Sequence, residues 1–151
     1  YSFIYPGIGY GGSCFPKDVK ALVQTAVECG YDSPLLRSVD AVNEQQKQSL
    51  IAKMMTYYRG KLSGKRFALW GLAFKPETDD IREAPALVII RRLLEEGAQV
   101  VAYDPKAAHE TQRELGDLPG LRYAEGHYEA LPGCDGLIVA TEWSFFLNPD
   151  F

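Results

Sequence analysis

One segment of the chain combines residue types that carry nucleophilic chemistry. Cys14 lies just before a predicted helix, with Lys17 and Asp18 in its first turn. A helix N-terminus and a neighbouring cation both stabilise a thiolate, the reactive form of cysteine. The alternative is an inert core cysteine, but such residues occupy apolar periodic positions, as Cys29 does. Asp18 falls about one helical turn from Cys14, where it can hold a water or orient a basic partner; alternatively, it only favours the helix start.

The glycines that precede this cysteine have the spacing of a dinucleotide-binding motif but not its context. Gly7, Gly9 and Gly12 fit the G-x-G-x-x-G spacing of dinucleotide-binding loops. That fingerprint follows a strand and opens a β-α-β unit, whereas here Pro6 precedes the glycines and two helices are predicted to follow. We therefore reject this interpretation. We expect a loop whose glycines let a bound ligand approach, with amides facing outward; an ordinary flexible loop is the alternative.

Two helices must position the segment. The first is predicted over about 16–29, and the second opens at Ser33-Pro34 and runs to Gly60. About 25 residues rising 1.5 Å each give a rod of about 37 Å, which predicts either an interdomain spacer or a spine for a homodimer. The apolar residues expected on one face of the second helix are Leu35, Leu36, Val39, Val42, Leu50, Ile51, Met54, Met55 and Tyr58.

From residue 65 onward the pattern changes to alternating strands and helices. Strands are predicted over 66–71, 98–103, 121–124 and 135–141, and helices over 83–96 and 107–115. This alternation predicts a Rossmann-like parallel sheet with helices on both faces. The fold class is therefore α/β: an all-helical segment with a long spine helix over 1–60, then an incomplete sheet domain over 61–151.

A second motif follows the first predicted strand, where α/β sheets bind ligands. Phe74 and Lys75 place an aromatic ring beside a cation, which suits a base or sugar next to a phosphate. The alternative is that Phe74 only fills space within the loop and that Lys75 is a charge exposed to solvent. Asp104 ends the second strand, but the glycine pattern of a dinucleotide site is missing here, so we expect a turn or cap role. His109 and His127 are interpreted as surface residues.

Composition excludes several function classes. Charged residues make up 24% of the chain and the net charge is −4, so we expect no nucleic-acid partner. No apolar run is long enough for a membrane span, and we expect a cytoplasmic protein. Three cysteines without close spacing favour neither a disulfide framework nor a metal site. The sequence starts without Met, and both ends look cut.

The two motifs together resemble one known family. The run from Gly9 to Leu22 is similar to the catalytic segment of the UDP-glucose/GDP-mannose dehydrogenase family, and the run from Gly71 to Pro85 is similar to its C-terminal UDP-binding domain. Phe15 resembles the members that oxidise UDP-glucose, because GDP-mannose members tend to carry Leu there. UDP-N-acetylmannosamine members carry a His before the cysteine. UDP-glucose is therefore the expected substrate; GDP-mannose and UDP-N-acetylhexosamines stay open.

The resemblance also implies roles for individual residues. It implies an NAD-dependent oxidoreductase of polysaccharide biosynthesis, in which Cys14 forms a thiohemiacetal and then a thioester, and Asp18 works with a lysine from an earlier segment in the hydrolysis. Substrate contacts are implied for Tyr5, Pro6, Gly7, Ile8, Gly9, Tyr10, Gly11, Phe74 and Lys75, and NAD contacts for Cys14, Phe15, Pro16, Lys17 and Arg82.

The chain as given is expected to lack the N-terminal NAD-binding domain. It is therefore expected to be an inactive module that binds a nucleotide sugar and dimerises. A further alternative makes the sheet domain a folding scaffold only, with the UDP contacts supplied by a missing strand and helix.

Overall fold

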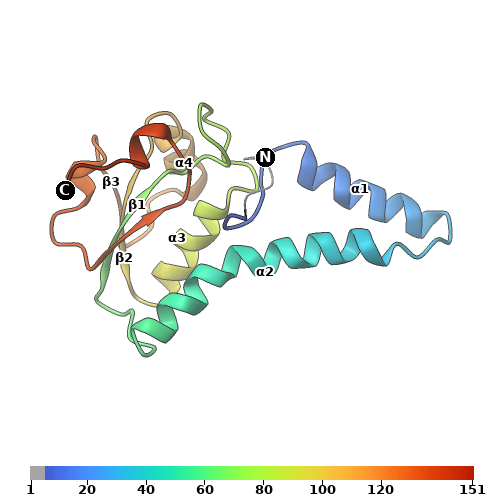
Figure 1. Cartoon of the computed structure of the whole chain (residues 1–151), viewed down its shortest axis with the longest axis horizontal. Helices are drawn as coiled ribbons and strands as arrows, with labels where there is room; N and C mark the ends of the chain where they lie inside the picture. Colours follow the sequence, from blue (N-terminus) through green and yellow to red (C-terminus); the bar gives the residue numbers. More distant parts are fainter. Residues whose placement is uncertain (1–5) are drawn as a thin grey trace.

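The computed structural model describes residues 6–151, which form a helical hairpin joined to a small α/β unit (Figure 1). In chain order the elements are α1 (Phe15–Glu28), α2 (Pro34–Tyr57), β1 (Arg66–Trp70), α3 (Pro85–Glu95), β2 (Gln99–Tyr103), α4 (Ala108–Leu115), β3 (Leu121–Tyr123), the 3-10 turn η2 (Tyr128–Ala130), β4 (Gly136–Val139) and the 3-10 turn η3 (Ser144–Phe146). The predicted fold class, a helical segment with a long helix before a parallel sheet, is confirmed.

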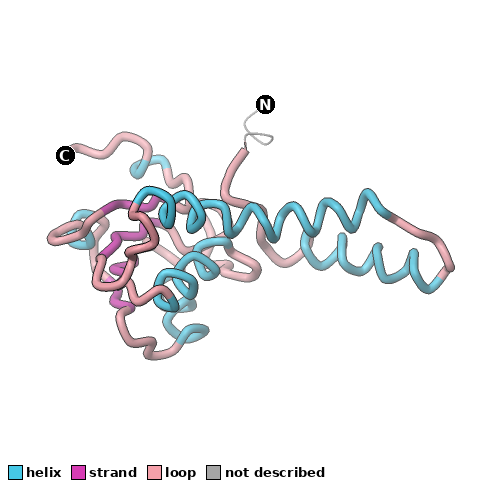
Figure 2. Tube along the Cα trace, turned by 90° about the horizontal axis from the view of Figure 1, so that it is seen from below, coloured by secondary structure: helices cyan, strands magenta, loops and turns pink. Residues whose placement is uncertain are grey.

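The helices α1 and α2 lie side by side and project away from the sheet, as both views show (Figures 1 and 2). Gly30 ends α1 with φ +70°, and the amide of Tyr31 then donates to the carbonyl of Ala26 at 2.8 Å. Ser33 is the N-cap of α2 and Pro34 its first residue, as predicted. Gly60, at φ +74°, closes a turn in which its amide donates to the carbonyl of Met55 at 2.8 Å.

The buried face of α2 differs from the predicted one. Its buried residues are Asn43, Lys47, Ile51 and Met54, which follow each other at helical spacing. Leu35 and Val42, predicted on the apolar face of this helix, are 75% and 61% exposed. The reason is that the C-terminal half of α2 packs on the sheet unit, whereas Leu35 and Val42 lie in the half that projects away from it beside α1 (Figure 1).

The sheet has four parallel strands in the order β3-β2-β1-β4. The strand β1 is central, because it pairs with β2 on one side and with β4 on the other. Its apolar run is buried because Phe67 and Leu69 belong to one apolar cluster and Ala68 and Trp70 to a second. Phe67 aligns with Val100 of β2 and with Gly136 of β4. Strands β2 and β3 are therefore added on one side of β1, and β4 is added on its other side. In open α/β sheets, ligands bind in the crevice at the point where the strand order reverses in this way.

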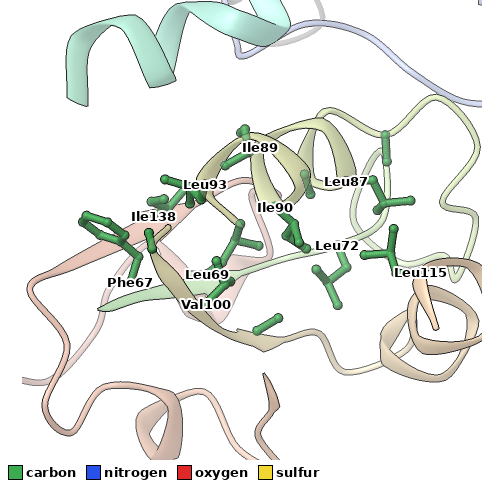
Figure 3. Packing of buried hydrophobic residues seen from close by; sticks show 14 of the residues in the cluster. Phe67, Leu69, Leu72, Leu87, Ile89, Ile90, Leu93, Val100, Leu115 and Ile138 are labelled. Atoms are coloured by element: carbon green, nitrogen blue, oxygen red, sulfur yellow. The ribbon is translucent and has the colours of Figure 1, made fainter. Parts of the chain in front are cut away.

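Helices α3 and α4 both cover one face of the sheet. Ile89, Ile90 and Leu93 of α3 pack with Leu69 of β1 and with Leu115 of α4 in one apolar cluster (Figure 3). On the other face, a second cluster is formed by Ala68, Trp70, Ala130, Trp143 and Phe146, so η2 and η3 provide the cover. The prediction of helices on both faces is therefore wrong for the described residues, where the second face carries only 3-10 turns.

His127 belongs to the aromatic side chains of that second face. Its ring centroid lies 5.0 Å from that of Trp70 and 4.1 Å from that of Tyr128, and its carbonyl accepts a hydrogen bond from Trp70 Nε1 at 2.7 Å. The prediction of a surface role is wrong for His127, because it is half-buried in this cluster. It holds for His109, which is exposed.

The helical hairpin and the sheet unit share one core. Ile51 and Met54 of α2 belong to the same buried cluster as Phe67 of β1 and Ile89 of α3. Burial of this apolar surface anchors α2 on α3 and fixes the direction in which the hairpin projects.

Three loops leave the carboxyl ends of β1, β2 and β4 and are tied together by Asp104. Its Oδ2 accepts from the amide of Leu72 at 2.8 Å and from Nε1 of Trp143 at 3.3 Å, while Oδ1 accepts from the amides of Lys106 and Ala107, each at 2.8 Å. The prediction of a turn or cap role for Asp104 is confirmed. The carboxylate fixes the start of the 71–84 loop, which reaches the glycine segment.

Candidate active site

Cys14 stands at the N-cap position of α1, and its side chain is exposed. Ser13 Oγ lies 3.6 Å from the sulfur. The amide of Asp18 donates to the carbonyl of Cys14 at 2.8 Å, so the predicted separation of one helical turn is found. The Asp18 carboxylate pairs with Lys17 Nζ at 3.1 Å. The sulfur is therefore accessible to a ligand and lies at the positive end of a helix dipole.

The glycine segment packs directly against the 71–84 loop. A Cβ on Gly11 would lie 2.5 Å from the carbonyl oxygen of Glu83, and one on Gly12, at φ +93°, would lie 2.9 Å from the Phe74 ring. The amide of Gly12 donates to the carbonyl of Arg82 at 2.7 Å. Side chains larger than hydrogen would push the two loops apart. Both glycines are thus required by the protein's own packing.

Two buried polar side chains of α2 hold the same segment from the other side. Asn43 Oδ1 accepts from the amide of Tyr10 at 2.8 Å, and its Nδ2 donates to the Tyr10 carbonyl at 3.1 Å. A Cβ on Gly9 would lie 3.0 Å from both Asn43 Oδ1 and Lys47 Cγ. The prediction of outward-facing amides is therefore wrong for Tyr10 and Gly12, whose N–H groups bond within the protein.

Arg82 lies in the 71–84 loop and meets the glycine segment through its backbone, because its carbonyl accepts the amide of Gly12, two residues before Cys14. Its guanidinium donates to both carboxylate oxygens of Asp80, at 2.9 and 2.7 Å. These hydrogen bonds raise the pKa of Arg82 and lower that of Asp80. The fold therefore brings the loop that carries Arg82 against the segment that leads to Cys14, although the two are far apart in sequence.

The remaining predicted residues lie around this junction. Phe74 is half-buried against Gly12, and Lys75 Nζ stands 5.3 Å from the Phe74 ring centroid. The Tyr10 and Phe15 rings meet edge to face with centroids 4.6 Å apart. Pro6, Gly7 and Lys17 are exposed, Pro16 is buried, and Ile8 packs on the main core. Tyr5, predicted as a substrate contact, lies outside the described residues.

Sequence reasoning missed three residues that hold the junction. Glu83 has φ +54° and binds Lys20 Nζ of α1 at 3.0 Å and Lys47 Nζ of α2 at 2.9 Å. The Lys47 side chain is only 2% exposed and also pairs with Glu44 at 2.8 Å. A signal for Asn43 and Lys47 existed, because they continue the helical spacing of Ile51 and Met54. No pattern in the sequence marked Glu83.

A cavity of about 360 Å³ shares Arg82 with the junction. It is lined by Asp79, Asp80, Ile81, Arg82, Glu110, Arg113 and Glu114. Four carboxylates against two guanidinium groups give this lining an excess of negative charge, which disfavours a pyrophosphate. The exposed N-terminus of α1, where Cys14 and Lys17 lie, suits an anionic ligand better.

The fold and this junction define a class of protein: a parallel α/β unit whose loops meet an exposed cysteine at a helix N-terminus. Comparison with known proteins makes the class specific. Residues 68–151 match the UDP-glucose/GDP-mannose dehydrogenase family, UDP binding domain, and residues 1–45 match the central domain of the same family. The chain belongs to the UDP-glucose/GDP-mannose dehydrogenase family, which confirms the resemblance seen in the motifs.

Individual relatives agree with this assignment. The chain is 47% identical to a UDP-glucose 6-dehydrogenase of Pseudomonas aeruginosa, a match that covers 99% of the chain and 34% of that protein. A UDP-glucose dehydrogenase from Pyrobaculum islandicum superposes with a TM-score of 0.86 at 36% identity, over 96% of the chain and 33% of its own. A GDP-mannose dehydrogenase of Pseudomonas aeruginosa superposes with a TM-score of 0.79 at 26% identity, and the match covers 96% of the chain and 34% of that protein. The chain thus spans about a third of the length of the relatives it matches.

Within residues 6–151, none of the helices is long and apolar enough to cross a membrane. The three cysteines are free thiols, and the described residues hold no cluster of His, Cys, Asp and Glu placed to bind a metal ion.

Proposed function

We propose that the complete protein is an NAD-dependent UDP-glucose 6-dehydrogenase in which Cys14 is the nucleophile. The observation that carries this proposal is the position of the Cys14 sulfur, exposed at the N-terminus of α1 directly after the glycine segment. An accessible thiol at a helix N-terminus is the setting of a nucleophilic cysteine. The 47% identity to a UDP-glucose 6-dehydrogenase supports the choice of substrate over GDP-mannose or a UDP-N-acetylhexosamine.

Cys14 provides the covalent steps of the reaction. Its sulfur adds to the C6 aldehyde carbon, the carbonyl oxygen takes a proton, and a thiohemiacetal results. After the second oxidation the product is a thioester. Water then adds to the thioester carbonyl, the carbon–sulfur bond breaks, and the thiolate leaves as the carboxylic acid is released. Asp18, one turn along α1, is proposed to hold this water, together with a lysine from an earlier segment.

NAD, when bound, supplies the hydride acceptor for both oxidations. The residues at the junction fit such a cofactor, since Lys17 and Arg82 are exposed cations and Phe15 offers an exposed aromatic ring beside the thiol. Cations and a helix N-terminus suit a pyrophosphate, and an aromatic ring can pack on a nicotinamide. We assign NAD contacts to Cys14, Phe15, Pro16, Lys17 and Arg82.

The substrate is proposed to lie along the outer edge of the contact between the glycine segment and the 71–84 loop, where both carry exposed residues. Lys75 is exposed and can pair with a phosphate, and the Phe74 ring beside it can pack on a sugar or base. Pro6 and Gly7 are exposed on the other side. Tyr5 keeps its proposed contact on sequence grounds, and Ile8, Gly9, Tyr10 and Gly11 complete the proposed set.

Replacement of Cys14 by Ser in the complete protein tests the reaction. Cys14→Ser removes the thiolate but keeps the shape, so formation of UDP-glucuronate from UDP-glucose is expected to stop, while UDP-glucose affinity stays within about twofold. Cys29→Ser, at the far end of α1, is the matched control and should keep wild-type turnover. Undiminished UDP-glucuronate formation by Cys14→Ser would refute the proposal.

The 151-residue chain itself is proposed to bind the uridine nucleotide without turnover. The match of residues 68–151 to a UDP binding domain supports this. Calorimetry with UDP and with UDP-glucose should show binding that Lys75→Ala weakens. Binding unaffected by Lys75→Ala would favour the scaffold alternative, and measurable turnover with NAD would refute the inactive module.

We further propose a homodimer through the helical hairpin, with the helical part over 1–60 and the UDP-binding part over 61–151. Large apolar side chains are exposed along α1, the connecting loop and α2, namely Leu22, Val27, Tyr31, Leu35 and Val42. A stripe of this kind, on helices that project from the body of the protein, is typical of a subunit interface.

A further inference from the structure

Glu83 joins the three segments that meet at Cys14. Its carboxylate binds Lys20 of α1 through Oε1 and Lys47 of α2 through Oε2, while its backbone carbonyl lies against Gly11. The residue before it, Arg82, accepts the amide of Gly12 through its carbonyl. A single residue thus contacts both helices and the glycine segment, although it belongs to the loop that leaves β1.

The backbone at Glu83 is strained, and the surrounding contacts hold it. A non-glycine residue at φ +54° is uncommon outside turns that are fixed by their neighbours. Such conformations persist where the surroundings over-determine them, and they cluster at functional sites. Here the two lysines and the Gly11 backbone provide the surroundings.

The two lysines that bind Glu83 differ in burial. The Lys47 side chain is 2% exposed, whereas that of Lys20 is 47% exposed. A pair with a buried ammonium is worth more than an exposed pair, which is screened by water. Lys47 is held between two carboxylates, Glu83 at 2.9 Å and Glu44 at 2.8 Å. Of the two, only Glu83 comes from the 71–84 loop, so its pair with Lys47 ties that loop to α2.

We propose that the buried Lys47–Glu83 pair is a positioning device that holds the 71–84 loop against the glycine segment and so fixes Cys14 at the start of α1. Glu83 itself does not touch the reacting atoms; it acts through its own contact with Gly11 and through the Arg82–Gly12 backbone bond. The inference rests on the proposed function for its catalytic consequence, but its structural part concerns only the reactivity of the cysteine.

A thiol-modification experiment tests the structural part without any activity. Iodoacetamide reacts with both exposed thiols of α1, so the ratio of Cys14 to Cys29 alkylation rates, read by peptide mass spectrometry, reports on Cys14 alone. Glu83→Gln should lower this ratio about fivefold, because the glycine segment that leads into α1 is no longer held, and a loosened helix start stabilises a thiolate less. Lys47→Met should have the same effect, and Lys47→Arg, which keeps the charge, should restore most of the ratio. Lys20→Gln, which removes only the exposed partner, should stay within about twofold.

Turnover in the complete protein tests the catalytic part. Displacement of a positioned group by about 1 Å can cost about 100-fold in rate, so Glu83→Gln should lower kcat by about 10- to 100-fold with KM for UDP-glucose changed less than about threefold. Should Glu83→Gln not fold, Glu83→Asp keeps the charge, shortens its reach, and should give a smaller loss of both rate and ratio.

The outcomes separate the two proposals. An unchanged alkylation ratio in folded Glu83→Gln overturns the positioning role, as does a loss in Lys20→Gln as large as in Lys47→Met. If the wild-type protein forms no UDP-glucuronate, the proposed function fails, yet the alkylation ratio still decides whether Glu83 and Lys47 hold the segment that carries Cys14.

Discussion

At the scale of single residues, Gly71 has the most restrictive surroundings in the sheet unit. It follows β1 with φ +90°, and a Cβ there would lie 2.4 Å from Cβ of Thr141. Gly71→Ala should therefore lower the free energy of unfolding by about 3 kcal/mol or more, since it adds a clash to backbone strain. Gly64→Ala is the control, because Gly64 has φ +77° but open space within the described part of the chain, and it should cost only about 1 kcal/mol. Urea unfolding measures both, and equal losses would contradict the clash.

Tyr123 presents the opposite case, a polar atom buried at a cost. Its hydroxyl is buried and has no hydrogen-bond partner within residues 6–151. Tyr123→Phe should therefore leave the free energy of unfolding unchanged or raise it by up to about 1 kcal/mol. Tyr58→Phe, which removes a hydroxyl that donates to the Asp135 carbonyl at 3.1 Å, should lower it by about 0.5 kcal/mol. A clear loss of unfolding free energy in Tyr123→Phe would show that the Tyr123 hydroxyl makes a hydrogen bond.

The same tyrosine predicts an alkaline effect. Burial raises the pKa of Tyr123 to about 12, so the folded state prefers the neutral phenol. This contribution to stability is complete below the ordinary tyrosine pKa of 10.0 and is lost as the pH rises through about 12. The stability difference between wild type and Tyr123→Phe should therefore change between these two pH values and be constant below them.

Residues differ in how far their roles could be predicted. The placement of Cys14 and Asp18 at a helix start, one turn apart, could be predicted because it depends on local sequence; their catalytic roles stay a prediction. Asn43, Lys47 and Glu83 were missed because their roles depend on which distant segment lies against them. The glycines were recognised as important, but the loop they pack against could not be identified from the sequence, so a ligand was expected where the protein itself lies.

At the scale of elements, Asp104 holds three loops at the carboxyl ends of the strands. Asp104→Ala leaves several buried amides and the Trp143 indole N–H without an acceptor, so it should lower the free energy of unfolding by about 3 kcal/mol or more. Asp117→Ala, at an exposed position, is the matched control and should stay within about 0.5 kcal/mol. Comparable losses in the two variants would remove Asp104 from this role.

The contact between the 71–84 loop and the helical hairpin should lose stability at low pH. Hydrogen bonds from Lys47 and Lys20 lower the pKa of Glu83 below its ordinary value of 4.5. The stabilisation by the ionised carboxylate is therefore complete above pH 4.5 and is lost as the pH falls through the lower, folded-state pKa. The difference in unfolding free energy between wild type and Glu83→Gln should be constant above this pH and shrink below it; a constant difference at all pH values would contradict the ion pair.

The positions of the helices and strands along the chain could be predicted well from the sequence, but the start of α3 and the buried face of α2 could not. The predicted helix over 83–96 begins only at Pro85, because Glu83 adopts a left-handed backbone to meet the lysines. The apolar residues predicted on one face of α2 are buried only where the helix packs on the sheet unit, and those in its projecting half are exposed. Hydrophobic periodicity reports that a residue is covered, but not by which surface.

At the scale of the whole molecule, the projecting hairpin predicts association. If the exposed apolar side chains of α1 and α2 form a subunit interface, wild type should sediment as a dimer at high micromolar concentration, and Val42→Lys should sediment as a monomer. Gln48→Lys adds the same charge at another exposed position of α2 and should remain dimeric. A monomeric wild type under these conditions would count against the interface.

The shared core of the hairpin and the sheet unit also bears on how relatives of this protein can recombine. Ile51 and Met54 lie on the helical side of the turn at Gly60 but are buried among side chains of β1 and α3. A chimera that exchanges UDP-binding parts at that turn would pair one parent's α2 with the other parent's sheet and leave gaps or overlaps in the core. A crossover point before Asn43 keeps the core and the Lys47–Glu83 pair from one parent, and chimeras joined there should fold more often than those joined at Gly60.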